Sequence, residues 1–289
     1  MKPGPFNAAN LINEFVSFDM APKQTLLLLE EIIVAQNWHE QNEAIELAEK
    51  WLPKFESRLQ RKAQDENEAA QVSRFAFNEA NPRFIQGSCF VEPRDSQKIA
   101  EAKKKRANCI HLYDALNSVS DNDFEKLCAK IITLWNVQDA VYTRASADQG
   151  IDFFGQVPFG EVIKKSAIAP GAEKQMKVWL VGQAKNYTRS TVSTKDIREL
   201  VGSVQLAKSK AYAGSIDPLA KLQMRSCDPV FFLFFTTGRL TQDALDLLKK
   251  AGVVAMDGHQ LSVFLADHDI GIVNNQFDDH NFRAWAFGP

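Results

Sequence analysis

The sequence lacks the patterns on which several large classes of protein depend. Its four cysteines form no Cys-x-x-Cys pair and have no paired histidines nearby, which argues against a zinc site and against a disulfide framework. The five histidines show no His-x-x-x-His spacing, and no Gly-x-Ser-x-Gly turn accompanies them, so hydrolases built on a catalytic triad are unsupported. No Gly-x-x-x-x-Gly-Lys-Ser/Thr loop occurs either, and an ATP-driven activity would require a separate subunit.

Long apolar runs and a signal peptide are also missing. The longest apolar runs, such as Val230 to Phe235, are far too short to span a bilayer. The N-terminus lacks the cationic start, the apolar run and the small-residue cleavage site of a secretory signal. Together with the cysteine usage, these absences predict a soluble protein of a reducing cytoplasm that has no membrane partner.

The length of 289 residues exceeds the size at which a single core usually stops growing, so two domains are expected. Between residues 25 and 70, apolar residues recur at helical spacing among many Glu, Lys and Gln residues. We therefore predict an all-helical N-terminal domain over 1–117 that serves recognition, dimerisation or regulation. Within it, the segment 81–95 carries two prolines and a glycine and is interpreted as a connector.

The remainder, 118–289, alternates between helical and strand patterns. Ser120 or Asp121 is expected to cap a helix that runs through Trp135. Further helices are predicted near 194–210 and 242–251, and strands near 140–143, 151–157, 178–185, 230–236 and 253–256. Alternation of this kind predicts an α/β domain in which a mixed sheet is flanked by helices.

The strand expected at 178–185 carries the most informative pattern, an apolar run that ends in Gln183-Ala-Lys185. Because side chains alternate between the two faces of a strand, Gln183 and Lys185 project to the same side. If 151–157 is the neighbouring strand, Asp152 enters the same cleft. Gln-x-Lys recurs elsewhere in the chain, and the buried-strand context separates this copy from the others. The three side chains suit a metal-dependent phosphodiesterase.

Each of these groups has a chemical role in such a site. Asp152 and the Gln183 carbonyl are hard oxygen ligands of the kind that Mg²⁺ prefers, and waters and a phosphate oxygen would complete its octahedron. The Lys185 ammonium orients the nucleophilic water, helps its deprotonation and offsets the charge that develops on the phosphorane. We therefore expect Mg²⁺ as the cofactor and a phosphodiester as the substrate.

Five ordered motifs over roughly the C-terminal 60% of the chain carry a family resemblance. They are Phe124-Glu125, Asp148-Gln-Gly-Ile-Asp152, Gln183-Ala-Lys185, Phe235-Thr-Thr-Gly238 and Met256-Asp-Gly258. In these motifs the sequence resembles a PD-(D/E)xK nuclease of the Mrr-like restriction endonuclease family. The resemblance implies a restriction-endonuclease-like mixed sheet flanked by helices and preceded by a mainly helical N-terminal domain.

The resemblance also assigns roles to single residues. Asp152 corresponds to the metal-binding acid of the family, Gln183 to the second site residue, Lys185 to the catalytic lysine and Glu125 to a helical carboxylate. The wider superfamily usually has Asp or Glu at the position of Gln183, whereas Gln is common among Mrr-like members. Glu125 can compensate for the lost charge, and an exposed glutamate on an ordinary helix is the alternative interpretation.

A concentration of positive charge surrounds these motifs although the whole chain has a net charge of -2. From Lys164 to Arg225 the sequence has twelve Lys or Arg and four acidic residues, a local charge of +8. A phosphate backbone would be attracted there. The alternative is that these residues form the solvated faces of a loop and a helix. The candidate DNA-binding residues are Lys164, Lys165, Arg189, Lys195 and Arg198.

These observations predict an Mg²⁺-dependent DNA endonuclease that cuts duplex DNA in restriction or anti-phage defence, with methylated and unmethylated DNA both open as the substrate. Cutting both strands with one site per chain favours a homodimer. Two other functions stay open: a DNA-binding module with a degenerate site, and a repair or recombination nuclease that acts on branched or single-stranded DNA. The sequence does not identify the DNA sequence or modification that would be recognised.

Overall fold

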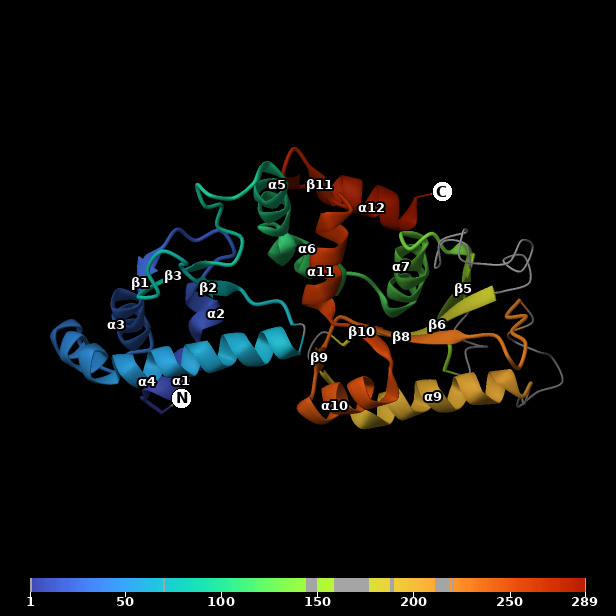
Figure 1. Cartoon of the computed structure of the whole chain (residues 1–289), viewed down its shortest axis with the longest axis horizontal. Helices are drawn as coiled ribbons and strands as arrows, with labels where there is room; N and C mark the ends of the chain where they lie inside the picture. The colour runs from blue at the N-terminus through green and yellow to red at the C-terminus, as the bar shows by residue number, and fades with distance from the viewer. Residues whose placement is uncertain are drawn as a thin grey trace. The chain divides into compact units, whose positions relative to one another are not determined.

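The structure of the chain is a computed structural model that describes residues 2–69, 71–143, 150–158, 177–187, 190–210, 219 and 221–288. It divides into two compact units (Figure 1). The first comprises Met1–Ile110 with Ile272–Phe277, and the second comprises His111–Gly271 with Asp278–Pro289. Among the described residues, no helix combines the length and the apolar composition needed to cross a bilayer.

The first unit is mainly helical, and its core lies between α3 and α4, where Leu29, Ile33 and Phe55 have no exposed surface. It also contains two small antiparallel sheets, one of three strands in the order β1-β3-β2 and one that pairs β11 with β12. The elements are α1 (Pro5–Asn10), α2 (Ile12–Phe15), β1 (Lys23–Gln24), α3 (Thr25–Ala35), α4 (Gln41–Glu68), β2 (Phe75–Phe77), β3 (Phe84–Gly87), α5 (Gln97–Arg106), β11 (Ile272–Val273) and β12 (Gln276–Phe277).

The prediction of an all-helical N-terminal domain is therefore wrong, because β3 lies inside the segment interpreted as a connector. Strands of two to four residues are too short to show an alternating pattern, so the sequence carries little signal for them. At the end of β3 the chain passes so close to Phe18 that a Cβ on Gly87 would lie 2.2 Å from the Phe18 carbonyl oxygen. The glycine thus permits a close approach of two backbones.

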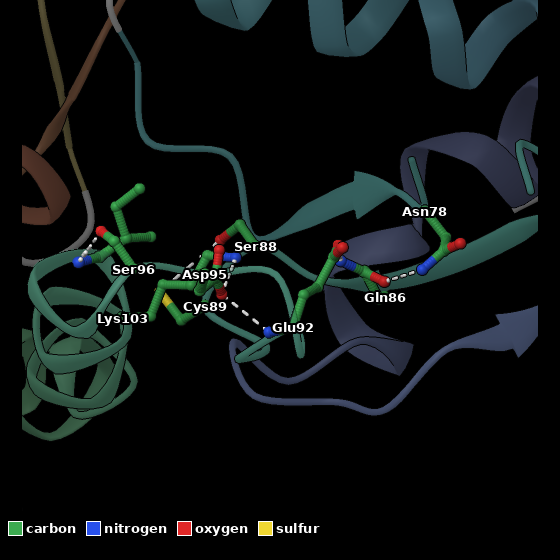
Figure 2. A network of polar contacts seen from close by, with 9 residues as sticks. Asn78, Gln86, Ser88, Cys89, Glu92, Asp95, Ser96 and Lys103 are labelled. Carbon is green, nitrogen blue, oxygen red and sulfur yellow. Dashed lines mark hydrogen bonds and ion pairs between the residues drawn. The ribbon is translucent and has the colours of Figure 1, made fainter. Parts of the chain in front are cut away.

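Polar contacts hold the chain that follows β3 (Figure 2). The buried amide of Gln86 accepts from Asn78 Nδ2 at 2.7 Å and donates to the Glu92 carboxylate. Asp95 accepts from the Glu92 backbone N–H at 2.7 Å and from Lys103 Nζ of α5 at 2.8 Å. The hydrogen bond from Lys103 lowers the pKa of Asp95. This segment is thus fixed to β3 and α5 by side-chain hydrogen bonds.

The second unit is built on a mixed five-stranded sheet in the order β10-β8-β6-β5-β4. The strands β4, β5 and β6 are antiparallel, whereas β6, β8 and β10 are parallel. The predicted mixed sheet is confirmed, and β8 has the bounds expected from the sequence. The strands are β4 (Gln138–Tyr142), β5 (Phe153–Pro158), β6 (Lys177–Lys185), β8 (Val230–Thr236) and β10 (Val254–Met256), and the short β7 (Thr191–Val192) pairs with β9 (Arg239–Leu240).

Helices cover both faces of this sheet (Figure 1). The helix α7 (Asp121–Thr133) packs on β5 and β6 from one side, and α9 (Thr194–Lys208) packs on β6 and β8 from the other, beside α10 (Gln242–Ala251). As predicted, Ser120 caps α7 and accepts from the Asp123 N–H at 3.2 Å. The remaining helices are α6 (Cys109–Asn117), whose first two residues belong to the first unit, α11 (Gly258–Asp267) and α12 (Asp279–Phe287).

Each face of β6 contributes to a different core because its side chains alternate. Trp179 and Val181 belong to a buried cluster with Leu200 of α9. Gly182 faces the other way, and a Cβ there would lie 2.2 Å from the ring of Phe153. Phe153 in turn stacks on Phe235, with ring centroids 5.2 Å apart. Strand β6 is therefore held from both sides, which gives its polar end a defined position.

Candidate nuclease site

The polar end of β6 brings Gln183 and Lys185 together. Both side chains lie on the α9 face of the sheet, which the alternation along the strand predicts. Gln183 is 1% exposed, whereas the Lys185 side chain is 25% exposed. A buried amide thus stands beside an ammonium group that solvent can reach.

The Gln183 amide has two orientations, and its neighbours favour one of them. In one, Nε2 lies 3.4 Å from Glu199 Oε1, but the amide oxygen then faces the backbone carbonyl of Asp196. In the other, the oxygen accepts from Lys185 Nζ at 3.2 Å and Nε2 donates to the Asp196 carbonyl at 3.2 Å. We adopt the second orientation because Nε2 then donates to a carbonyl and the amide oxygen accepts from an ammonium. The amide oxygen then lies 3.4 Å from Glu199 Oε1, and the Lys185 ammonium offsets the repulsion between these two oxygens. Gln183 is thereby attached to α9 and contacts the lysine.

Asp152 lies directly before β5, which begins at Phe153, two residues after the predicted start at Ile151. Its backbone N–H nevertheless donates to the Gly182 carbonyl at 2.9 Å, which continues the pairing with β6. The carboxylate is 3% exposed, and its Oδ2 accepts from the Ala184 N–H at 2.6 Å. Asp152 is therefore held against the backbone between Gln183 and Lys185.

The approach to Asp152 depends on Gly150. This residue has a φ of +80°, and a Cβ there would lie 2.4 Å from Ser203 Oγ and 3.6 Å from Glu199 Cγ, both on α9. A larger residue would be strained by its backbone angle and would also push α9 away. The conformation explains the glycine in the Asp148–Asp152 motif, although Asp148 itself lies outside the described residues.

Glu125 comes from α7, the helix that packs on β5 and β6. One of its carboxylate oxygens, Oε2, is buried. Three residues farther along the helix, burial raises the pKa of the Cys128 thiol well above its ordinary value, and the negative charges of Asp152 and Glu125 raise it further. Both carboxylates therefore act electrostatically on the same thiol of α7.

The start of α9 is anchored by a capping box. Ser193 Oγ accepts from the Lys195 N–H at 3.3 Å, and Asp196 Oδ2 accepts from the Ser193 N–H at 2.8 Å. Tyr187, just past β6, donates its hydroxyl to Asp196 Oδ1 at 3.0 Å. Burial opposes ionisation of Asp196, but these hydrogen bonds outweigh it and lower its pKa. The helix that faces Gln183 is thus fixed at its N-terminus.

Asn186 was missed by reasoning from the sequence. Its Nδ2 donates to the Val119 carbonyl and to Asp121 Oδ1, both at 3.0 Å, and its Oδ1 accepts from Thr237 Oγ1 at 2.8 Å. The partners are 51 to 67 residues away in the chain, so no local pattern could reveal them. These bonds connect the residue after Lys185 to the start of α7 and to the end of β8.

The exposed face of α9 carries two of the five candidate DNA-binding residues. Lys195 and Arg198 are both exposed and lie three positions apart, on one face of the helix. The other three, Lys164, Lys165 and Arg189, lie outside the described residues. The two described cations belong to the helix that contacts Gln183 and Lys185.

The oxygen donors at this site suit a hard divalent cation. Asp152 supplies a carboxylate and Gln183 a carbonyl oxygen, and Mg²⁺ in proteins is commonly held by one or two such groups together with water and phosphate oxygens. Across the described residues, no group of three or more His, Cys, Asp or Glu side chains is arranged to hold a metal ion. The four cysteines, all in the described part of the chain, form no disulfide.

Two solved structures resemble this chain in part. One is described as "MspJI Restriction Endonuclease in Complex with 27-mer Oligonucleotide", with 17% identity, a TM-score of 0.40 and coverage of 69% of this chain and 40% of that one. The other is "DNA modification-dependent restriction endonuclease AspBHI", with 17% identity, a TM-score of 0.41 and coverage of 71% and 45%. The chain thus spans less than half the length of either protein.

A family model gives the more specific comparison. No curated protein sequence matches the chain. Residues 116–216 match the Mrr_cat family, which is described as a restriction endonuclease. Glu125, Asp152, Gln183 and Lys185 all lie within the matched segment, whereas the motifs at Phe235 and Met256 lie beyond it. The family model thus identifies an Mrr_cat restriction endonuclease domain at residues 116–216.

Proposed function

We propose that the protein is an Mg²⁺-dependent endonuclease that hydrolyses phosphodiester bonds of double-stranded DNA. The observation that carries this proposal is the position of the Lys185 ammonium, which contacts Gln183 on the strand whose backbone also binds the Asp152 carboxylate. A role in restriction or anti-phage defence within a reducing cytoplasm is part of the proposal. The match of residues 116–216 to restriction endonucleases supports it, and so does a set of four cysteines that form no disulfide in the described residues.

Asp152 and Gln183 are the residues that would hold the ion. A carbonyl oxygen has two lone pairs, so the contact between Gln183 and Lys185 Nζ leaves one of them for a cation. The backbone hydrogen bond to Asp152 Oδ2 fixes the orientation of that carboxylate. When bound, Mg²⁺ would polarise the scissile phosphate and offset its negative charge.

Lys185 is the group that acts on the water and on the developing charge. Its ammonium has three donors and no acceptor, so it can hold a water oxygen and a phosphate oxygen at the same time. Because Gln183 accepts from Nζ at 3.2 Å, the side chain is oriented before the DNA arrives. A preorganised cation of this kind stabilises the phosphorane more than the ground state.

Glu125 is proposed to restore the charge that Gln183 lacks. A neutral amide in place of a carboxylate weakens the attraction for Mg²⁺ by about 4 kcal/mol for each unit of charge on the cation, at an effective dielectric near 20 and a few ångströms. Glu125 and Asp152 both raise the pKa of Cys128, so their charges act on one region. A second carboxylate there would strengthen the binding of a divalent cation.

Incubation of the full chain with supercoiled plasmid tests the proposed function. Methylated and unmethylated plasmids are each treated with Mg²⁺ or with EDTA, and nicked and linear products are separated on agarose. We expect cleavage of at least one plasmid with Mg²⁺ and none with EDTA. DNA binding without cleavage of either plasmid would instead favour a module with a degenerate site. Cleavage limited to branched or single-stranded DNA would favour a repair or recombination nuclease.

The basic face of α9 is proposed to contact the DNA backbone. Lys195→Glu and Arg198→Glu should each weaken DNA binding and reduce the slope of log K against log salt by roughly 0.9, since each removes one phosphate contact. Lys250→Glu, an exposed reversal on α10, is the matched control and should leave the slope nearly unchanged. Fluorescence anisotropy over a range of salt concentrations measures the slope. Unchanged slopes in both α9 variants would exclude this face.

We also propose that the chain works as a homodimer, because two strands of opposite polarity require two sites and each chain has one. The N-terminal helices offer exposed apolar side chains for the contact: Leu27 on α3 is 46% exposed and Ile45 on α4 is 42% exposed. The doubly substituted Leu27→Glu/Ile45→Glu protein should be monomeric, as measured by light scattering with and without DNA. Ile99→Glu on α5 is the control. A wild-type protein that stays monomeric on DNA would contradict the dimer.

A further inference from the structure

Glu199 of α9 is a second acidic group beside Lys185, and neither the sequence motifs nor the family resemblance includes it. Its Oε1 lies 4.0 Å from Lys185 Nζ, within the range of an ion pair. The Glu199 side chain is 46% exposed, so it stands at the surface of the site. Lys185 therefore has two neighbours that attract it, the Gln183 oxygen at 3.2 Å and the Glu199 carboxylate at 4.0 Å.

We propose that Glu199 is a positioning residue that holds the Lys185 ammonium in place for the reaction. The inference rests on the proposed nuclease function and adds a residue to that site. Glu199 itself need not contact the DNA or a metal ion, because its effect is exerted through the lysine.

The backbone of α9 supports this role. Ile197, Leu200 and Val204 are buried in the core of the second unit, which fixes the rotation of the helix about its axis. The helix also lies against Gly150, so closely that a Cβ on this glycine would contact the side chains of Ser203 and Glu199. The helix thus cannot turn without loss of buried contacts, and Glu199 is directed toward Lys185.

The physical reason for such a residue lies in the flexibility of lysine. A lysine side chain has about 2 kcal/mol of rotamer entropy, so an ammonium with one contact samples many positions. A catalytic group displaced by about 1 Å can lose roughly 10² in rate. A second attraction restricts the ammonium further, because the Gln183 oxygen on β6 and the Glu199 carboxylate on α9 lie 3.4 Å apart and both face Nζ.

Three substitutions at Glu199 separate charge from shape. Glu199→Ala and Glu199→Gln should each lower the single-turnover cleavage rate by about 10- to 100-fold, the range for residues that orient a catalytic group. Glu199→Asp keeps the charge and should retain more activity than Glu199→Gln. The DNA dissociation constant should stay unchanged or fall, since a negative charge is removed. The Mg²⁺ concentration for half-maximal rate should not move.

A double-mutant cycle tests whether Glu199 acts through the lysine. In the Lys185→Ala background, adding Glu199→Ala should lower the residual rate no further, because the group that it positions is gone. Asp246→Asn on α10 is the matched control, an exposed helical acid changed to its amide in the same unit, and should keep the wild-type rate.

Nuclear magnetic resonance provides a readout that does not need cleavage. The order parameter of the Lys185 ammonium group, assigned with Lys185→Arg, should fall in Glu199→Ala and Glu199→Gln and stay at the wild-type value in Asp246→Asn. If the wild type cuts no DNA, the nuclease proposal fails, and this measurement still decides whether Glu199 restrains Lys185. An unchanged order parameter overturns the positioning role. So does a Glu199→Ala variant with the wild-type rate, or one whose only defect is a higher Mg²⁺ requirement.

Discussion

We expect Asp152→Ala and Lys185→Ala each to lower the rate of plasmid cleavage by a factor of about 10² to 10³ or more, the effect of removing one preorganised group from a polar active site. Asp152 is the carboxylate held by the Ala184 N–H, and Lys185 is the only ammonium among the described residues that contacts Gln183. Under the proposed mechanism, loss of the first would remove the negatively charged metal ligand, and loss of the second would remove the donor to water and phosphate. DNA affinity should change little.

The test of these variants must separate chemistry from folding. Lys185 is 25% exposed, so its truncation leaves no closed cavity. Asp152 is buried, and Asp152→Asn is the better isosteric change because the amide oxygen can still accept from the Ala184 N–H. Circular dichroism and anisotropy accompany the nicking assay, and Asp246→Asn serves as the control. A folded Asp152→Asn or Lys185→Ala protein that cuts at the wild-type rate would show that the site is elsewhere.

Phe153→Ala lowers the free energy of unfolding by about 3 to 5 kcal/mol, the usual cost of truncating a buried phenylalanine. Phe153 has no exposed surface, stacks on Phe235 and fills the space above Gly182, where the close approach leaves no room for a Cβ. The cavity would open directly beneath the polar end of β6. Since Asp152 precedes Phe153, cleavage should also fall.

Phe231→Ala is the matched control, because Phe231 is on β8 of the same sheet but 49% exposed. Its truncation should change stability by no more than about 0.5 kcal/mol, as for most surface substitutions. Urea unfolding followed by circular dichroism measures both, and the slope with denaturant shows whether the two-state treatment holds. An equal decrease in the free energy of unfolding for Phe153→Ala and Phe231→Ala would mean that the packing around Phe153 does not stabilise the unit.

Local sequence is sufficient to predict the bounds of a helix or strand where that element is long and its apolar residues are periodic. The sequence predicts both ends of β8 and α10, and it narrows the cap of α7 to Ser120 or Asp121, of which the structure has Ser120, because apolar period and capping residues act over a few neighbouring positions. The shared face of Gln183 and Lys185 follows from strand alternation alone. The roles of Asp152, Gln183, Lys185 and Glu125 remain proposals that rest on the family resemblance and on chemistry.

Tertiary structure decided what depends on residues far apart in the chain. The three-stranded sheet of the first unit has strands too short to carry a period and exists because distant segments pair. Asn186 acquires its partners 51 to 67 residues away, and Glu199 reaches Lys185 only because α9 packs on β6. A sequence pattern predicts on which face of a helix or strand a side chain lies, whereas tertiary packing determines which residues contact that face. For this protein, the sequence alone therefore indicated Asp152, Gln183 and Lys185 as candidate site residues. Only the fold placed the Glu199 carboxylate beside Lys185.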